Sequence, residues 1–307
     1  SRPIHIFMIG DSTMANKSIA DSACERGWGM MLPCHLSDDI IVDNHALNGR
    51  SSKSFIDEGH WQEVLDLIQP GDYVFIQFGH NDEKPQADRH TDPGTTFDAN
   101  LRRFCLETRA KGGIPVLFNS VVRRNFFDNK NASAEDDLRK ENMGNPLEGD
   151  SLIDTHGAYL DSPCNVAKEL GVTFVDANKI THDLEQKMGK EGSKKLHMWV
   201  APGTVKAYPK GKQDNTHYNI YGGKIVSGLI MDQVGIQIPA LKKYIRHYDY
   251  VVSNDGRGDF FSLQQCIDSV PFGKKVIVLV RSGKYPKPKI SKGKKVKLVV
   301  YKEARIK

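Results

Sequence analysis

The sequence has 307 residues, of which 39% are hydrophobic and 26% are charged. This is enough apolar material for one large folded domain with a small appendage, and it excludes a chain that is disordered by composition. No apolar run approaches the roughly 18 residues that a membrane-spanning helix requires. Because the chain begins at Ser1 rather than at a methionine, we expect a processed amino terminus, with a secreted or periplasmic location.

The net charge of +5 is concentrated at one end of the chain. Residues 281–307 hold eleven Lys and Arg against a single acid, Glu303, which leaves residues 1–280 with a charge of −5. A basic segment suits a polyanion, whether an acidic polysaccharide, a nucleic acid or an anionic membrane. A solvated surface without a partner is the simpler interpretation.

The five cysteines are odd in number and form no CxxC pair, so a zinc site or a dithiol redox motif is not favoured. Cys24 and Cys34 are candidates for a disulfide in an oxidising compartment. We favour the alternative that the cysteines are small, partly buried thiols.

Five short runs of β-branched and aliphatic residues recur along the first 180 positions. Each is too short for a helix and too continuously apolar for a half-exposed strand, which is typical of buried parallel strands. The runs are Ile4–Ile9, Ile40–Asp43, Tyr73–Phe78, Ile114–Asn119 and Val172–Asp176. Stretches with helical spacing alternate with them, around 61–68, 97–106, 162–170 and 220–234. This alternation predicts an α/β domain with about five parallel strands.

Two further boundaries follow from the pattern. The polar segment 121–150 comes directly after the fourth predicted strand, so we expect it to lie over the ligand-binding edge of the sheet. The first domain is expected to span residues 1–240. Residues 246–307 are expected to form a second unit, with a strand, a Gly-rich turn, a short helix and another strand.

Candidate active-site residues follow three of the predicted strands. Ser12 lies in "GDST" after the first, Gly49 in "NGRSS" after the second, and Asn81 in "FGHND" after the third. Carboxyl ends of parallel strands meet at one edge of a sheet, where a hydroxyl, a backbone N–H and an amide can face a ligand together. These groups suit a nucleophile and the donors of an oxyanion hole.

Asp214 and His217 stand three residues apart near the end of the first domain. A carboxylate that close to an imidazole can hold one ring nitrogen and leave the other free as a base. Each block also has an ordinary explanation: Asn81 as a turn cap, Gly49 as relief of a backbone angle, and Asp214 as a helix cap. Together the four blocks supply every group that acyl transfer requires.

The blocks "GDST", "NGRSS", "GHND" and "DNTH" resemble those of the SGNH, or GDSL-type, hydrolases. The longer forms "IGDSTMAN", "NGRSSKSF" and "FGHNDEKP", together with "DTHGAYLD", are most similar to the rhamnogalacturonan acetylesterase branch, over about residues 3–236. The resemblance implies a flavodoxin-like three-layer α/β/α fold and a serine hydrolase without metal or cofactor. It implies that Ser12 is the nucleophile, His217 the base and Asp214 its orienting acid, with Ser12, Gly49 and Asn81 forming the oxyanion hole.

The implied substrate is acetylated pectin, a polyanion, so we expect cations near the cleft. Arg50, Arg123 and Arg124 are candidates by their places after strands, and His80 and His156 by their places in the motifs. An ordinary surface cation is the alternative for each arginine. No nucleic acid and no membrane insertion are expected, and the sequence leaves the oligomeric state open.

The function expected is therefore removal of acetyl groups from pectin. Other acyl esters, either acetylated xylan or a lipid, are alternatives within the same chemistry, as for a lipase or thioesterase. A carbohydrate-binding protein with an inactive site is an alternative of another class, disfavoured by the intact Ser12, Asp214 and His217.

Residues 249–301 resemble the opening of the pectin methylesterases, which are parallel β-helices, through "DGRGDF" and "IDSVP". The resemblance implies a small, partial β-helix-like unit without methylesterase activity, because the carboxylates of that family would lie further along the chain. Stacking of successive coils is what stabilises a β-helix. We therefore expect this fragment either to be cut from a longer protein or to pack on the first domain.

Overall fold

The computed structural model describes residues 1–127 and 149–307. Its centre is a five-stranded sheet of order β3-β1-β4-β5-β8, and every neighbouring pair is parallel. The strands are β1 (Ile4–Gly10), β3 (Ile40–Asn44), β4 (Tyr73–Gln77), β5 (Ile114–Phe118) and β8 (Thr173–Val175). The prediction of five parallel strands is confirmed.

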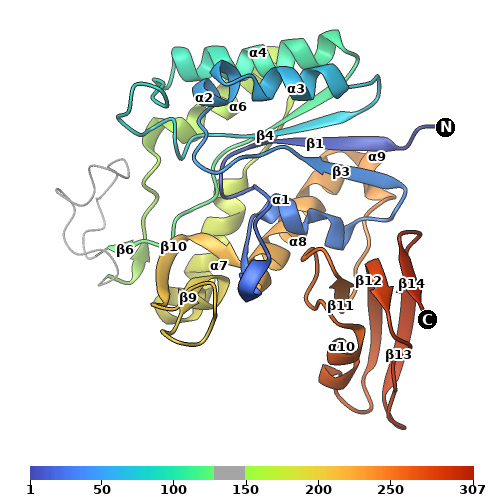
Figure 1. Cartoon of the computed structure of the whole chain (residues 1–307). Helices are drawn as coiled ribbons and strands as arrows, with labels where there is room; N and C mark the ends of the chain where they lie inside the picture. Colours follow the sequence, from blue (N-terminus) through green and yellow to red (C-terminus); the bar gives the residue numbers. More distant parts are fainter. Residues whose placement is uncertain (128–148) are drawn as a thin grey trace.

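Helices cover both faces of this sheet (Figure 1). Along β1, Ile6 and Met8 join one apolar core while Phe7 and Ile9 join the other, as strand alternation requires. One layer contains α2 (Ser52–Asp57), α3 (His60–Leu67), α4 (Thr96–Ala110) and α6 (Asp161–Leu170). The other contains α1 (Trp28–Met31), α7 (Ala177–Gly192), α8 (Ile220–Gln237) and α9 (Pro239–Lys242). The three-layer prediction therefore holds.

A second, smaller sheet lies outside these layers and was not predicted. It is antiparallel and consists of β2 (Glu25–Arg26), β10 (Lys212–Asn219) and β9 (His197–Val200), in that order. A further short pair joins β6 (Phe126–Phe127) to β7 (Ser151–Leu152). Most of the predicted excursion over the cleft, residues 128–148, lies outside the described residues.

Residues 250–306 form a separate parallel sheet with one helix. Its elements are β11 (Tyr250–Ser253), α10 (Leu263–Ser269), β12 (Lys275–Tyr285), β13 (Lys295–Val300) and β14 (Ala304–Ile306). The predicted order of strand, turn, helix and strand is confirmed. The structure shows an additional parallel sheet here and does not show a β-helix, so that part of the expectation finds no support.

This C-terminal unit packs against the first domain beside α1 and α8 (Figure 1). Leu279 and Val251 from the sheet meet Met31 and Cys34 in a shared apolar cluster. The Tyr301 hydroxyl donates a hydrogen bond of 2.8 Å to the Leu36 carbonyl.

All five cysteines are free thiols, so Cys24 and Cys34 are not joined. Three of the thiols, at Cys34, Cys105 and Cys266, are buried, as the preferred interpretation expects. Among the described residues, no helix is long and apolar enough to cross a membrane.

Candidate active site

The loops that follow β1, β3 and β4 meet at one edge of the central sheet. β1 lies between the other two strands, with Gly10 in register with Gln77 and Met8 in register with Asn44. The Leu47 N–H donates to the Gly10 carbonyl at 3.0 Å, which joins the first two loops. The Asn81 side-chain amide donates to the Arg50 carbonyl at 3.1 Å, which joins the last two.

The residues predicted to be catalytic form one continuous hydrogen-bonded chain. Ser12 Oγ lies 2.8 Å from His217 Nε2, although 205 positions separate the two residues. His217 Nδ1 lies 2.8 Å from Asp214 Oδ2. The other Asp214 oxygen accepts the backbone N–H groups of Thr216 at 2.8 Å and of His217 at 2.9 Å. The carboxylate therefore holds both the ring and the main chain of His217.

The electrostatics of Asp214 set the proton positions in this chain. Burial alone would raise the pKa of Asp214, but the hydrogen bonds and charge of His217 outweigh burial and hold that pKa well below its usual range. An ionised Asp214 accepts the Nδ1–H of His217, which leaves the Nε2 lone pair facing the Ser12 hydroxyl. This is the tautomer that can remove the hydroxyl proton.

The three predicted oxyanion donors are positioned at the same edge. Gly49 has a φ of +75°, a conformation that disfavours any residue with a Cβ. Within the described parts of the chain, the backbone N–H groups of Ser12 and Gly49 donate no hydrogen bond. Asn81 uses one amide hydrogen for the Arg50 carbonyl, and its Oδ1 accepts from Arg89 at 3.4 Å. These contacts orient the amide and leave its second hydrogen available.

The turn that carries Ser12 is fixed by a buried polar network. Asp11 Oδ1 accepts from the Thr13 backbone at 3.0 Å and from the Thr13 hydroxyl at 2.7 Å. Gln77 on β4 donates to that hydroxyl at 2.7 Å and accepts from the Trp28 indole at 3.1 Å. Ser12 therefore lies on a turn that has few alternative conformations.

Asp214 and His217 lie on strand β10 and not in a loop, and neither caps α8. Asn219 performs that capping role, with its side chain accepting from the Gly222 N–H. The pairing of β10 with β9 shifts register between Asp214 and Tyr218, which creates an irregularity around the two candidate residues. Such bulges re-aim side chains, and they occur preferentially beside active sites.

Arg124 is buried behind this hairpin and is not an accessible cation. Its guanidinium donates to Asn215 Oδ1 and to Ser193 Oγ, both at 2.8 Å, and to the Lys190 carbonyl. Its backbone N–H donates to the Asn215 carbonyl at 2.8 Å. The expected substrate contact is therefore not supported, since Arg124 holds the residue next to Asp214 instead.

The other two candidate arginines also have partners within the protein. Arg123 is buried, with an ion pair of 2.6 Å to Glu83 and a hydrogen bond of 2.9 Å to Thr155. Its placement likewise does not support a substrate contact. Arg50 is at the surface and pairs with Glu58 at 2.9 Å. It is the one of the three that a solute can reach.

The two candidate histidines, His80 and His156, come together although 76 positions separate them. His156 Nε2 lies 3.0 Å from His80 Nδ1, and His156 Nδ1 lies 2.7 Å from Asp154 Oδ1. Both imidazoles are buried.

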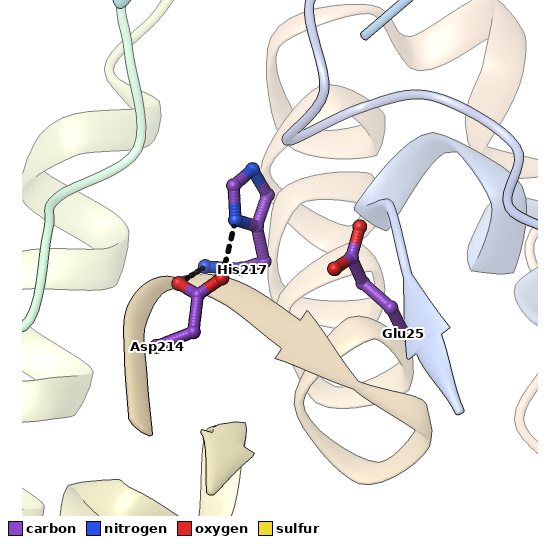
Figure 2. Close-up of side chains that lie close together, drawn as sticks. All are labelled: Glu25, Asp214 and His217. Atoms are coloured by element: carbon purple, nitrogen blue, oxygen red, sulfur yellow. Dashed lines mark hydrogen bonds and ion pairs between the residues drawn. The ribbon is translucent and has the colours of Figure 1, made fainter. Parts of the chain in front are cut away.

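Glu25 is a neighbour of the candidate base that the sequence did not reveal. It lies on β2, which pairs with β10, and Figure 2 shows its side chain beside His217 and Asp214. Glu25, Asp214 and His217 each place one potential ligand atom within 4.8 Å of the others. A two-residue strand without a motif carries no signal in the sequence.

These three residues fit the hydrogen-bonded chain better than they fit a metal ion. Asp214 and His217 are already bonded to each other, and Glu25 forms an ion pair of 3.1 Å with Lys17. Lys17 also donates to Asn48, the neighbour of Gly49. Glu25 and Lys17 thus link the strand carrying His217 to the loops carrying Ser12 and Gly49.

Comparison with known proteins agrees with this geometry. Residues 8–201 match the GDSL-like lipase/acylhydrolase family. The chain is 34% identical over 259 residues to the rhamnogalacturonan acetylesterase RhgT of Bacillus subtilis, covering 83% of this chain and 97% of that protein. It is 27% identical over 250 residues to a rhamnogalacturonan acetylesterase of Emericella nidulans, covering 80% of this chain and 90% of the other.

A solved structure shares the fold. The crystal structure of protein YxiM from Bacillus subtilis matches with a TM-score of 0.60 and 23% identity, over 78% of this chain and 58% of that one. The chain thus spans less than two thirds of that relative. Taken with the sequence matches, the chain belongs to the GDSL-like lipase/acylhydrolase family and is a carboxylic ester hydrolase.

Proposed function

We propose that this ester hydrolase is a carbohydrate O-acetylesterase that removes acetyl groups from pectin, with rhamnogalacturonan as the preferred polymer. The observation that carries the proposal is the contact of 2.8 Å between Ser12 Oγ and His217 Nε2, continued from His217 to Asp214. Ser12 is the proposed nucleophile, His217 the base, and Asp214 the acid that orients it.

The reaction proceeds in two halves. His217 takes the Ser12 proton as the hydroxyl oxygen attacks the acetyl carbonyl, and the N–H groups of Ser12, Gly49 and Asn81 stabilise the oxyanion. His217 then protonates the departing sugar oxygen, which leaves an acetyl group on Ser12. A water molecule, deprotonated by His217, attacks the acetyl-enzyme, and collapse of the second oxyanion releases acetate and returns the proton to Ser12.

The relatives support the substrate part of the proposal. Two proteins named rhamnogalacturonan acetylesterase align with at least 80% of this chain, and one of them is 34% identical to it. Pectin is a polymer that is degraded outside the cell. We therefore also propose a secreted or periplasmic location for the enzyme. Acetylated xylan and lipid esters remain the alternatives that an assay must separate.

Acetate release tests the proposal directly. The wild-type enzyme should release acetate faster from acetylated rhamnogalacturonan than from acetylated homogalacturonan or xylan, without added metal. Ser12→Ala should lose nearly all turnover while keeping its fold, because the attacking oxygen is gone. Equal rates on pectin and xylan would contradict the pectin assignment, and a Ser12→Ala variant with full activity would contradict the mechanism.

A further inference from the structure

The C-terminal unit has a group of lysines on one face of its sheet. In the parallel pair of β12 and β13, Lys275 is in register with Lys295, and Ile277 is in register with Lys297. Paired residues of neighbouring strands lie on the same face of a sheet, and so do residues two positions apart along one strand. Lys275, Lys295 and Lys297, the groove lysines, therefore lie together, and all three are exposed.

The groove lysines lie on the part of this face that the first domain leaves open. Further along the same face, Leu279 and Val299 pack against the first domain. The opposite face of the two strands packs on α10. In Figure 1, β12 and β13 extend away from the first domain. An open groove of about 570 Å³ lies over the three lysines and Ile277.

The charge of the groove lysines is not balanced by nearby acids. Lys53 on α2, for comparison, forms an ion pair of 2.7 Å with Asp57. No carboxylate of a described residue lies within 4.0 Å of the groove lysines. Among the described residues that line the groove, the one acid is Asp249, and it already accepts the backbone N–H of Ile277 at 2.7 Å. The groove is therefore positively charged.

Protection of the sheet edge explains only part of this arrangement. Within the described chain β13 pairs with β12 alone, and lysines on such an edge strand discourage pairing with other chains. That role accounts for Lys295 and Lys297. It does not account for Lys275, because β12 lies inside the sheet, between β11 and β13. Placing Lys275 beside Lys295 adds a repulsion that an anionic ligand would relieve.

We propose that the groove lysines bind the carboxylates of an acidic polysaccharide, at a site separate from Ser12. Positive charge makes an anionic polymer the fitting partner. The described residues of the groove include no arginine and no aromatic side chain, which are the groups that nucleic-acid surfaces use to hold phosphates and to stack bases. Ile277, 37% exposed beside the lysines, offers apolar contact to the C–H face of a sugar ring.

The choice of a polysaccharide rests on the proposed pectin function, and it adds a second contact with the same polymer. A chain held at the C-terminal unit keeps its acetyl groups at a high local concentration for the active site. The groove takes no part in the chemical step. It therefore acts on KM for the polymer, and not on kcat or on the hydrolysis of small esters.

Replacing the three lysines together tests the proposal. Lys275→Gln, Lys295→Gln and Lys297→Gln in one chain remove three charges and keep polar side chains. The probe is polygalacturonate without acetyl or methyl esters, titrated by calorimetry at low and at physiological salt. We expect this variant to raise Kd about 10-fold, the combined effect of losing three exposed ion pairs. Salt should weaken the binding of the wild-type protein by screening.

A matched control has the same net charge as this variant. Lys111→Gln, Lys187→Gln and Lys242→Gln in one chain remove three exposed charges from the first domain, and this protein should bind polygalacturonate as wild type does. Both triple variants should hydrolyse p-nitrophenyl acetate with wild-type kcat/KM, which shows that the fold and the active site are intact. Lys275→Gln alone, which leaves the edge strand unchanged, should raise Kd about twofold.

Other results overturn the proposal. Equal losses of affinity in the two triple variants would mean that total charge decides binding. No measurable wild-type binding at low salt, or equally tight binding of duplex DNA, would mean that the groove does not select an acidic polysaccharide. The result is separable from the proposed function, because polygalacturonate without esters is not a substrate. Binding can be present when no acetate is released from rhamnogalacturonan, and absent when acetate is released.

Discussion

Asn81 illustrates how one side chain can serve both stability and chemistry. One amide hydrogen closes the contact to the Arg50 carbonyl, and the other is free for a developing oxyanion. Asn81 also follows the strand next to β1, so its place relative to Ser12 is set by the register of the sheet. A donor held in this way needs no reorganisation when negative charge appears on the substrate.

Removing this amide tests the oxyanion assignment. Asn81→Ala should reduce kcat on a good acetyl ester about 10²- to 10³-fold, the usual effect of losing one oxyanion donor. The free energy of unfolding should fall by only about 1 kcal/mol, since the Arg50 carbonyl loses one partner. Steady-state kinetics and a urea titration measure the two effects. A wild-type kcat in this variant would show that Asn81 does not stabilise the oxyanion.

The lowered pKa of Asp154 predicts that the stability of the protein changes with pH. Burial alone would raise this pKa, but the charge and hydrogen bonds of His156 outweigh burial. Its folded-state pKa lies below its ordinary value of 3.8. The stability that it contributes is therefore complete above about pH 5 and is lost as pH falls through about 4 and below. Asp154→Asn should be less stable than wild type at pH 7, and the difference should shrink towards pH 3.

Thermal unfolding at several pH values measures this convergence. Asp232→Asn, at an exposed aspartate of α8, is the matched control and should show no such convergence. A constant difference between Asp154→Asn and wild type from pH 7 to pH 3 would contradict the role of ionised Asp154.

At the scale of elements, the hairpin of β9 and β10 is the part of the site that the sequence least reveals. Buried parallel strands can be predicted from continuous runs of apolar residues. The sequence of β10 is "KQDNTHYN", which has neither an apolar run nor an alternation of apolar and polar residues. Its side chains were predictable only as motif residues, because Asp214 and His217 lie three positions apart. The strand itself depends on tertiary partners that a local pattern does not encode.

Arg124 is the main such partner, and the structure does not support its prediction as a cation in the cleft. Its place directly after a predicted strand suggested a cation in the cleft, yet the side chain turns inward to Asn215, Ser193 and the end of α7. Arginine is suited to this task because its planar guanidinium donates in several fixed directions at once. Lysine cannot reproduce that pattern.

Arg124→Lys should therefore impair catalysis without touching the reacting groups. We expect the free energy of unfolding to fall by about 1–3 kcal/mol as buried acceptors lose their donors. We also expect kcat to fall about 10-fold as the segment holding Asp214 and His217 loosens, with little change in KM. Arg102→Lys, at an exposed ion pair with Glu169, should leave both quantities near wild type. A loss confined to KM would instead restore Arg124 as a substrate contact.

At the scale of the whole molecule, the order of the chain was easier to predict than its contacts. The five strands were predicted from apolar runs, and the motifs were found after those runs. The pattern with a Gly-rich turn predicted a second unit over residues 246–307. How that unit packs could not be predicted, because the contact joins residues far apart in sequence. The Arg26 guanidinium, for example, reaches the Gly256 carbonyl at 3.0 Å from the strand that carries Glu25.

This contact predicts that the two units unfold together. Leu279 is fully buried in the cluster with Met31 and Cys34, whereas Ile277, two positions earlier on β12, is 37% exposed. Leu279→Ala should lower the free energy of unfolding by about 2–5 kcal/mol, as for other large-to-small core substitutions. Ile277→Ala, the matched control, should change it by less than about 1 kcal/mol. Calorimetry and the loss of esterase activity should give one coincident transition in each variant, because the interface also holds β2 beside His217. Two separate transitions in the wild-type protein would show that the C-terminal unit is energetically independent of the active site.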